Sequence, residues 1–262
     1  MTLHHAQQYS EINDSATSPL NSREMGGSRI GDNTLLERFN SYFDMLPANS
    51  LKRIRIAQRI RYQVYCVEHS HERSDSPAGL ETDEFDSHAV QSLLIHRATK
   101  SALGTVRLIL PLAHELERSF AVQRVMDENS LRTFNQLPLH STAEVSRFSI
   151  SRQFWRAVDT SGSPESAPPI SNLGPLMRLG LIQALVRMSM KHSITHWCAA
   201  MEPMLLRMLS AMAIRFRPVG PLVEYHGPRQ PCYCVIADVL NAMRCERPAF
   251  WSVLTDRGAL ID

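Results

Sequence analysis

The sequence predicts an α/β fold, in which a central mixed β-sheet is covered by helices on both faces. The first observation is a pair of alternating apolar runs, 90–98 and 102–112, on either side of the turn Thr99-Lys100-Ser101, as in an antiparallel hairpin. The second is that later segments alternate between strand length and helical periodicity, at 142–151, 173–191, 194–201 and 203–214. The third is size, because 262 residues with 44% hydrophobic content can bury the core of one large domain.

The N-terminal residues 1–33 are rich in Ser, Asn, Gly and His and have little apolar periodicity. Such a segment cannot offset the entropy of ordering, so we expect it to be disordered and a single domain to span 34–262. Apolar residues at helical spacing from Leu35 to Leu46 predict a first helix that stops before Pro47. Ser50 then has the position of an N-cap for a second helix.

The second helix, 51–65, combines an apolar face with a basic one. The basic residues are Lys52, Arg53, Arg55, Arg59 and Arg61. A solvated helix surface explains such charges, and a docking patch for an acidic partner is the functional alternative.

A polar loop, 68–79, leads into the acidic run Glu81-Thr82-Asp83-Glu84-Phe85-Asp86. Arg107 falls in the second hairpin strand, and Glu144 and Arg147 fall in the strand 142–151. A charge on a largely buried sheet needs a partner or a function, so these acids and arginines are candidates for one polar cluster. A set of structural ion pairs is the alternative interpretation.

Glu144 and Arg147 are three residues apart, so a regular strand would direct them to opposite faces of the sheet. We therefore predict a β-bulge near 145–149, which would turn both side chains toward one cleft.

The rest of the chain continues the pattern of helices and strands. A connection with some helical character runs to His140, and a flexible loop is expected at 159–169. The later elements are a helix at 173–191, a strand at 194–201, a helix at 203–214, strands at 216–223 and 232–236, and helices over 238–254. The chain contains 12 Met residues, and those of the helices 173–191 and 203–214 suit either ordinary core packing or an adaptable apolar tunnel.

Composition excludes several classes of protein. Lys+Arg 28 against Asp+Glu 26 gives a net charge of +2, which argues against a nucleic-acid-binding protein. The sequence has no apolar run of the roughly 18 residues that a membrane span needs. Five cysteines, an odd count, and the lack of a signal-peptide pattern predict reduced thiols and a cytoplasmic location. His69, His71 and Glu72 suggest metal ligands but have no well-spaced third His or Cys, so we predict no metal and no bound cofactor.

This order of elements and motifs resembles the GNAT (acyl-CoA N-acyltransferase) fold over about 51–254. More narrowly, it is similar to acyl-homoserine-lactone (autoinducer) synthases and N-acyl amino acid synthases. The matching positions are Arg61 and Tyr65, then Glu81, Asp83 and Asp86, then Arg107, then Glu144 and Arg147. A closer likeness is to acyltransferases associated with exosortase and PEP-CTERM protein-sorting systems. That likeness lies in the runs 61–68, 194–197, 201–203 and 224–227.

The resemblance implies an N-acyltransferase that joins a medium or long acyl chain to an amino acid or related amine. It implies Glu144 as general base and Glu81 as a supporting carboxylate that positions the amine, and Glu81 is itself a plausible base if burial raises its pKa. Arg107 and Arg147 would orient the acids or hold the carboxylate of the acceptor. Asp83 and Asp86 complete the catalytic cluster, and Arg61, Tyr65, Phe148 and Ser149 are assigned to substrate binding.

Either acyl-carrier protein or acyl-coenzyme A is implied as the acyl donor. The segment 172–180 departs from the phosphate-binding turn of acetyltransferases that use coenzyme A, although it keeps glycines and a helix start. Arg53, Arg55 and Arg59 are the candidates for docking a carrier protein. A lipid product would allow peripheral membrane contact. The alternative function is a noncatalytic binding module for an acyl carrier or a sorting system.

Overall fold

The computed structural model describes residues 32–69, 76–160, 173–225 and 227–261. All of them belong to the compact unit that spans residues 31–262.

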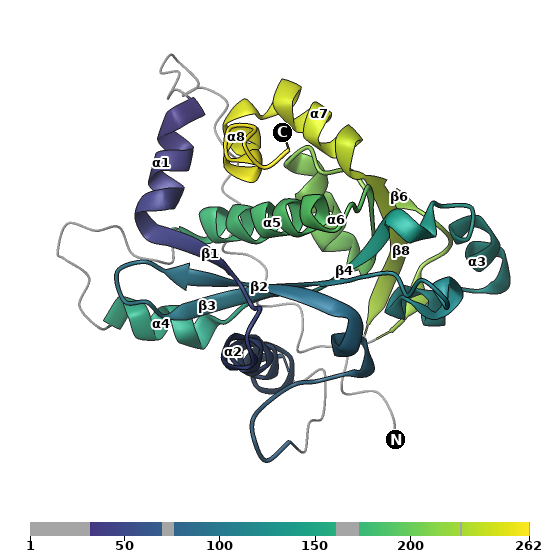
Figure 1. Cartoon of the computed structure of the whole chain (residues 1–262), viewed down its shortest axis with the longest axis horizontal. Helices are drawn as coiled ribbons and strands as arrows, with labels where there is room; N and C mark the ends of the chain where they lie inside the picture. The colour runs from purple at the N-terminus through teal and green to yellow at the C-terminus, as the bar shows by residue number, and fades with distance from the viewer. Residues whose placement is uncertain (1–31, 70–75, 161–172, 226, 262) are drawn as a thin grey trace, which may run out of the picture. The chain divides into compact units, whose positions relative to one another are not determined.

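In the described ranges, eight strands form one mixed sheet (Figure 1). Seven of them follow one another across the sheet in the order β1 (Phe43–Pro47), β2 (Ala89–His96), β3 (Ala102–Ile109), β4 (Thr142–Ile150), β5 (His196–Met201), β8 (Pro228–Val235) and β6 (Arg217–Pro218). The short β7 (Val223–Glu224) also pairs with β8. Neighbouring strands are antiparallel except β4 and β5, which are parallel. The predicted hairpin and mixed sheet are confirmed.

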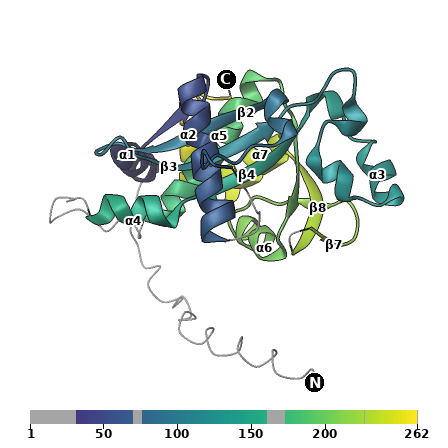
Figure 2. The same ribbon diagram turned by 90° about the horizontal axis from the view of Figure 1, so that it is seen from below.

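One face of the sheet is covered by the long helix α5 (Gly174–Lys191), which packs on β1, β2, β3 and β4. Against α5 lies α8 (Pro248–Thr255), which in turn contacts α1 (Asp32–Tyr42) and α7 (Ile236–Glu246). The opposite face carries α2 (Leu51–Tyr62), which contacts β2, β3 and β4, and α4 (Arg152–Thr160), which contacts β3 (Figures 1 and 2). Helices therefore cover both faces, as the sequence predicts.

The first predicted helix is too long. The helix α1 ends at Tyr42, and Phe43–Pro47 forms the edge strand β1, paired with Ser92–His96 of β2. Phe43 and Met45 are buried and alternate with more exposed neighbours, which is the period of a half-buried strand. Local helical spacing was overridden here because β2 provides an unpaired edge whose backbone groups need partners.

The second helix runs further than predicted and changes type. After α2 the chain continues as a π-helix over Gln63–Glu68. Glu68 at its end accepts hydrogen bonds from the Ser151 hydroxyl at 2.7 Å and from the Gln153 backbone N–H at 3.1 Å. Glu68 thus satisfies the N-terminus of α4 from 84 residues away, a helix that the sequence analysis did not predict. Ser151 also caps α4 locally, because its hydroxyl accepts a hydrogen bond from the Phe154 backbone N–H at 3.1 Å. A local serine and a distant carboxylate together therefore fix the start of this helix.

The remaining connections are mostly as expected, with one correction. The predicted helical connection is confirmed as 3₁₀-helices at Leu116–Arg118, Ala121–Val125 and Leu139–Ser141, together with α3 (Glu128–Phe134). The helix α6 (Pro203–Ala211) begins at its proline, as predicted. The predicted strand 216–223 is wrong for most of its length, because only the two-residue strands β6 and β7 form there and β8 is the long strand.

Candidate active site

The strand β4 contains the predicted β-bulge. Thr105 of β3 pairs with Ser149, whereas Arg107 pairs with Ser146, so two residues of β3 span three residues of β4. Arg147 takes up the extra residue with φ +49°, in the left-handed region. The bulge brings Arg147 to the face of the sheet that also carries the Arg107 side chain, which bonds to Ser146. A regular strand would have placed Arg147 on the opposite face, so this prediction from spacing is confirmed.

The strands β4 and β5 separate beyond Glu144. Their parallel pairing consists of three residue pairs: Thr142 with His196, Ala143 with Trp197, and Glu144 with Cys198. Beyond that point both strands continue without pairing to each other, β4 to Ile150 and β5 to Met201. Glu144 therefore sits where the sheet opens.

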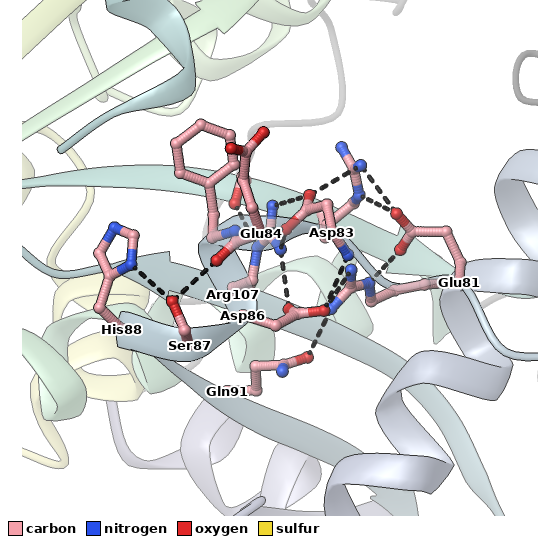
Figure 3. A network of polar contacts seen from close by, with 12 residues as sticks. Glu81, Asp83, Glu84, Asp86, Ser87, His88, Gln91 and Arg107 are labelled. Carbon is pink, nitrogen blue, oxygen red and sulfur yellow. Dashed lines mark hydrogen bonds and ion pairs between the residues drawn. The ribbon is translucent and has the colours of Figure 1, made fainter. Parts of the chain in front are cut away.

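Three arginines and three carboxylates lie in a closed, alternating ring on this face of the sheet (Figure 3). Its members, in order around the ring, are Arg61, Glu81, Arg147, Asp83, Arg107 and Asp86. They come from α2, the acidic run, β3 and β4, so the tertiary fold assembles charges that are up to 86 residues apart (Arg61 to Arg147). The ring has no net charge.

The contacts of the ring are short, and two of its six pairs, Arg107–Asp83 and Arg61–Asp86, are bidentate. Arg107 donates to Asp83 Oδ1 at 2.6 Å and Oδ2 at 2.8 Å, and to Asp86 Oδ1 at 2.8 Å. Arg147 donates to Glu81 Oε1 at 2.8 Å and to Asp83 Oδ2 at 3.2 Å. Arg61 donates to Glu81 and, at 2.6 Å, to Asp86 Oδ1. Buried pairs of this kind offset the cost of desolvation only when the remaining polar atoms are also satisfied.

The ring keeps its acids ionised. Burial acts to raise the pKa of Glu81, but hydrogen bonds from Arg147 and Arg61 outweigh it and hold that pKa below its ordinary value. The pKa values of Asp83 and Asp86 are lowered in the same way, mainly by Arg107 and Arg61 respectively. A carboxylate with a lowered pKa is a weak base, so the structure argues against Glu81 as the group that deprotonates an amine.

Glu144 has the opposite environment. Its side chain is 5% exposed, and Oε2 accepts a hydrogen bond from the Val122 backbone N–H at 2.9 Å. Burial raises the pKa of Glu144 to about 7, and neither this hydrogen bond nor the charges of Arg107 and Arg147 cancel that effect. A carboxylate with a pKa near neutrality is suited to exchange protons with a substrate.

A cleft of about 920 Å³ passes the opening between β4 and β5. Its polar wall includes Glu81, Asp83, Arg107, Glu144 and Arg147. Its apolar wall comes from α5, β5 and the segment that begins with α6, and consists of Ile182, Leu185, Trp197, Met201, Leu205, Leu209, Ile214 and Phe216. The cleft can hold a molecule with one polar reacting end and one long apolar tail.

Two of the four residues assigned to substrate binding lie in the cleft wall and two do not. Tyr65 and Phe148 line the cleft, and the Tyr65 ring lies 5.1 Å below the Arg147 guanidinium. Arg61 is fully buried within the ring, and Ser149 is fully buried with its hydroxyl bonded to the Arg147 carbonyl at 3.1 Å. Neither Arg61 nor Ser149 is among the described residues that line the cleft, so we infer that both support the site from behind its wall.

The methionine-lined tunnel is also a correction. Among the described residues of the cleft wall, Met201 is the methionine present. Met177 and Met188 of α5 are packed in the main hydrophobic core. Leucine, isoleucine and aromatic side chains form the apolar wall instead.

The predicted docking and phosphate-binding segments are partly described. Arg55 and Arg59 on α2 are exposed, whereas Arg53 is partly covered and bonds to the Pro47 carbonyl at 3.2 Å. The helix α5 starts at Gly174 with Pro175 in its first turn and no side-chain cap. The residues 161–172 before it lie outside the described ranges, as do His71, Glu72 and His226.

The 3₁₀-helix Ala121–Val125 was missed as part of the site. Ala121, Val122, Arg124 and Val125 line the cleft, and Val122 holds Glu144. The sequence signal for it is weak, because the contact to Glu144 comes from a backbone N–H that every residue except proline carries.

Among the described residues, no group of three or more His, Cys, Asp or Glu side chains is arranged to hold a metal ion. Within the same ranges, none of the helices has the length and apolar character that crossing a membrane requires.

Residues 60–161 match the model of a family described as Acetyltransferase (GNAT) domain. The match begins next to Arg61 and contains the whole charged ring together with Glu144. A search of curated proteins gave no match.

Several solved structures share the fold. One is FeeM, an N-acyl amino acid synthase from uncultured soil microbes, at 16% identity and a TM-score of 0.52, covering 76% of this chain and 95% of FeeM. TofI, solved in a ternary complex with an inhibitor and MTA, is 17% identical with a TM-score of 0.53, covering 79% of this chain and 99% of TofI. MesI, a CoA-dependent acyl-homoserine lactone synthase, is 17% identical with a TM-score of 0.50, covering 78% and 93%. At these identities the likeness shows the GNAT-like fold.

Proposed function

We propose that this protein is an N-acyltransferase, which moves a medium or long acyl chain from a thioester to the amino group of an amino acid or related amine. The matched acetyltransferase domain supports acyl transfer. The observation that carries the proposal is Glu144, a buried carboxylate with a pKa of about 7 that lies where β4 and β5 separate, in a cleft with one polar and one apolar wall.

The chemistry requires a base. An amino group with a pKa of about 8 or above arrives mostly protonated and cannot attack until one proton is removed. The Glu144 carboxylate would take that proton, directly or through one water, because its pKa is closer to that of the amine than an ordinary carboxylate's. The amine nitrogen then forms a bond to the thioester carbonyl carbon, the carbon–sulfur bond breaks, and the thiolate leaves and takes up a proton as the nitrogen loses its second one.

The charged ring supports the reaction by holding the residues around Glu144 in place. Arg107 and Arg147 are committed to Glu81, Asp83 and Asp86, so we assign them to shaping the polar wall and to holding the bulge beside Glu144. This replaces the expectation that they hold the acceptor carboxylate. Their positive charges also limit how far burial raises the pKa of Glu144.

The apolar wall suits the acyl tail. It lies on the side of the sheet covered by α5, whereas Arg107 and Glu144 face the other side, and the cleft passes between them. A tail placed among Leu185, Leu205 and Leu209 would be shielded from water while the thioester carbonyl stays near Glu144.

For the donor we propose acyl-carrier protein, with acyl-coenzyme A as the alternative. Arg55 and Arg59 lie on the exposed face of α2, the helix that continues into the π-helix with Tyr65 at the cleft. An acidic carrier docked there would approach the cleft from the side of Tyr65. The motif likeness to exosortase-associated acyltransferases supports a role beside a protein-sorting system, in the cytoplasm, with the lipid product bringing the protein to membrane surfaces.

The competing function is a noncatalytic module that binds an acyl carrier. The closed ring gives this alternative a physical basis, since its charges are explained by mutual pairing alone. A noncatalytic module does not explain why the buried Glu144 carboxylate is present, beyond its acceptance of the Val122 N–H.

The experiment is mass spectrometry of lipid extracts from cells that express the wild type or Glu144→Gln, followed by assays of the purified proteins with acyl-carrier and acyl-coenzyme A thioesters. Glutamine keeps an acceptor for the Val122 N–H and removes the base. We expect an N-acylated product from the wild type and a loss of at least a hundredfold in Glu144→Gln. Binding of acylated carrier without product in either protein would favour the noncatalytic module.

A further inference from the structure

Among the described residues of the cleft wall, two arginines lie outside the charged ring, Arg124 and Arg229. Arg229 is on β8 and donates to Glu202 Oε1 at 3.0 Å, next to the start of α6. Arg124 is on the 3₁₀-helix Ala121–Val125, two residues after Val122, whose N–H bonds to Glu144. Of the two, Arg124 belongs to the element that touches the proposed base.

We propose that Arg124 binds the carboxylate of the acceptor, in place of Glu84, and thereby selects amino acids over amines that lack a carboxylate. This inference rests on the proposed function, because it names the group that recognises the acceptor of that reaction.

The guanidinium of Arg124 lies over an aromatic ring. It lies 4.6 Å from the centre of the Phe85 ring, and Phe85 is itself buried. A guanidinium stacked on an aromatic ring keeps its edge free to make two parallel hydrogen bonds, which is the geometry that a carboxylate accepts.

Glu84 already occupies this position with a carboxylate. Its side chain forms an ion pair with Arg124, and the two side chains are 63% and 54% exposed. An ion pair with both partners in water contributes little, so a substrate carboxylate can displace Glu84 at small cost. The Glu84 carboxylate therefore marks the place and the chemistry of the subsite.

The Glu144 carboxylate and the Arg124 side chain are both connected to one 3₁₀-helix, Ala121–Val125. Val122 fixes Glu144, and Arg124 follows within the same 3₁₀-helix. In an α-amino acid the amino and carboxylate groups are attached to one carbon, so an acceptor bound with its nitrogen at Glu144 would have its carboxylate within the same part of the cleft. Arg107 and Arg147 are not available for this task because each already holds two carboxylates of the ring.

The test compares amino acids with the amines that their decarboxylation gives: glycine with methylamine, leucine with 3-methylbutylamine, and phenylalanine with phenethylamine. The proteins are wild type, Arg124→Gln, Glu84→Gln and the control Arg217→Gln. Arg217 pairs with Asp238 at similar exposure, 63% and 61%, and does not line the cleft. Acylation rates with a fixed donor give kcat and KM, and calorimetry gives amino-acid binding without turnover.

We expect Arg124→Gln to raise KM for the amino acids at least tenfold while KM for the amines stays within about twofold. Glu84→Gln should lower KM for the amino acids, because the competing carboxylate is gone. A structural ion pair predicts instead that both variants lose activity together and toward both kinds of acceptor.

The proposal is overturned if wild type does not prefer the acid members, if Arg124→Gln keeps the wild-type preference, or if Glu84→Gln raises KM as Arg124→Gln does. An equal effect of Arg217→Gln would also overturn it. If wild type acylates none of these acceptors, the proposed function fails. Calorimetry then tests the carboxylate subsite independently of turnover. Amino-acid binding that Arg124→Gln abolishes and Arg217→Gln retains supports the subsite, and its absence in wild type rejects it.

Discussion

Arg147 Nη2 donates to Glu81 Oε1 at 2.8 Å across 66 residues of sequence, and it does so from a backbone position with φ +49°. The bulge at this residue turns Arg147 toward the acidic run, and the pairing of β4 with β5 ends close to it, at Glu144. One local irregularity therefore closes the charged ring and shapes the cleft. A non-glycine residue in this region is strained, and its two carboxylate partners offset that strain.

The ring makes Arg107 more important for stability than for contact with a substrate. Arg107→Ala would leave Asp83 and Asp86 as like charges with half of their partners removed. We expect the free energy of unfolding to fall by about 3–5 kcal/mol, measured by urea denaturation at pH 7. Arg217→Ala, at an exposed pair, should stay within about 1 kcal/mol of wild type. A loss from Arg107→Ala as small as that of the control would show that the ring contributes nothing to folding.

The base assignment predicts the direction of a pH profile. Glu144 accepts a proton only when ionised, so kcat/KM should rise with pH as a group with a pKa of about 7 loses its proton. Wild-type kcat/KM measured from pH 5 to 9 should show this limb below pH 7. A rate that is constant from pH 5 to 7 would remove Glu144 from the role of base.

The raised pKa of Glu144 also predicts how stability depends on pH, and stability should change in the direction opposite to kcat/KM. Because folding raises the pKa of Glu144 from 4.5 to about 7, the folded state binds more protons than the unfolded state between these values. Stability relative to Glu144→Gln should therefore fall as pH rises from about 4.5 to 7. From below pH 4.5 to pH 8, the stability of the wild type relative to the variant should fall by up to about 3 kcal/mol. Urea denaturation at pH 5 and pH 8 measures the change, and a constant difference would contradict the raised pKa.

Charge reversal on α2 separates the two donors. Replacing Arg53, Arg55 and Arg59 by Glu should lower the second-order rate constant for carrier-bound acyl groups more than tenfold, through weaker encounter with an acidic carrier. The rate for acyl-coenzyme A of equal chain length should change less. Raising salt until the Debye length falls toward roughly 8 Å should slow only the wild-type reaction with the carrier.

A matched control for that experiment reverses three exposed charges elsewhere, namely Lys100, Arg132 and Lys191. If charge reversal on α2 slows the reactions with both donors equally, or if the control variant slows them as much, the arginines of α2 do not dock a carrier and only form a solvated helix face.

The N-terminal boundary is tested by two deletions. Removing residues 1–31 should leave the melting temperature within a few degrees, because the segment has too few apolar residues to pack. Removing 1–40 also takes away Leu36 and Phe39, which are buried in the main core, and should destabilise the protein by several kcal/mol. A large drop from the shorter deletion would show that residues 1–31 dock on the domain. Because α1 starts at Asp32, the cut belongs before that residue rather than after Asn33.

The sequence by itself determined the class of fold, the hairpin, the helices from Leu51 and Gly174, and the bulge. These follow from periodicity and spacing, which act over short distances: a strand alternates every second residue, so a needed pair at Glu144 and Arg147 requires one extra residue. The motif order also placed Glu144 and the ring residues in one site.

The tertiary structure decided the environment of each charged group. Glu81 and Glu144 are the same residue type, yet two arginines lower the pKa of one while burial raises that of the other. Arg61 and Ser149 are fully buried, and Arg124 lines the cleft from a 3₁₀-helix whose place in the site the sequence did not indicate. The strand β1 and the helix α4 likewise depend on partners far along the chain, the edge of β2 and the carboxylate of Glu68. Charge pairing, burial and edge pairing are properties of neighbours in space, which is why the order of residues alone did not reveal them.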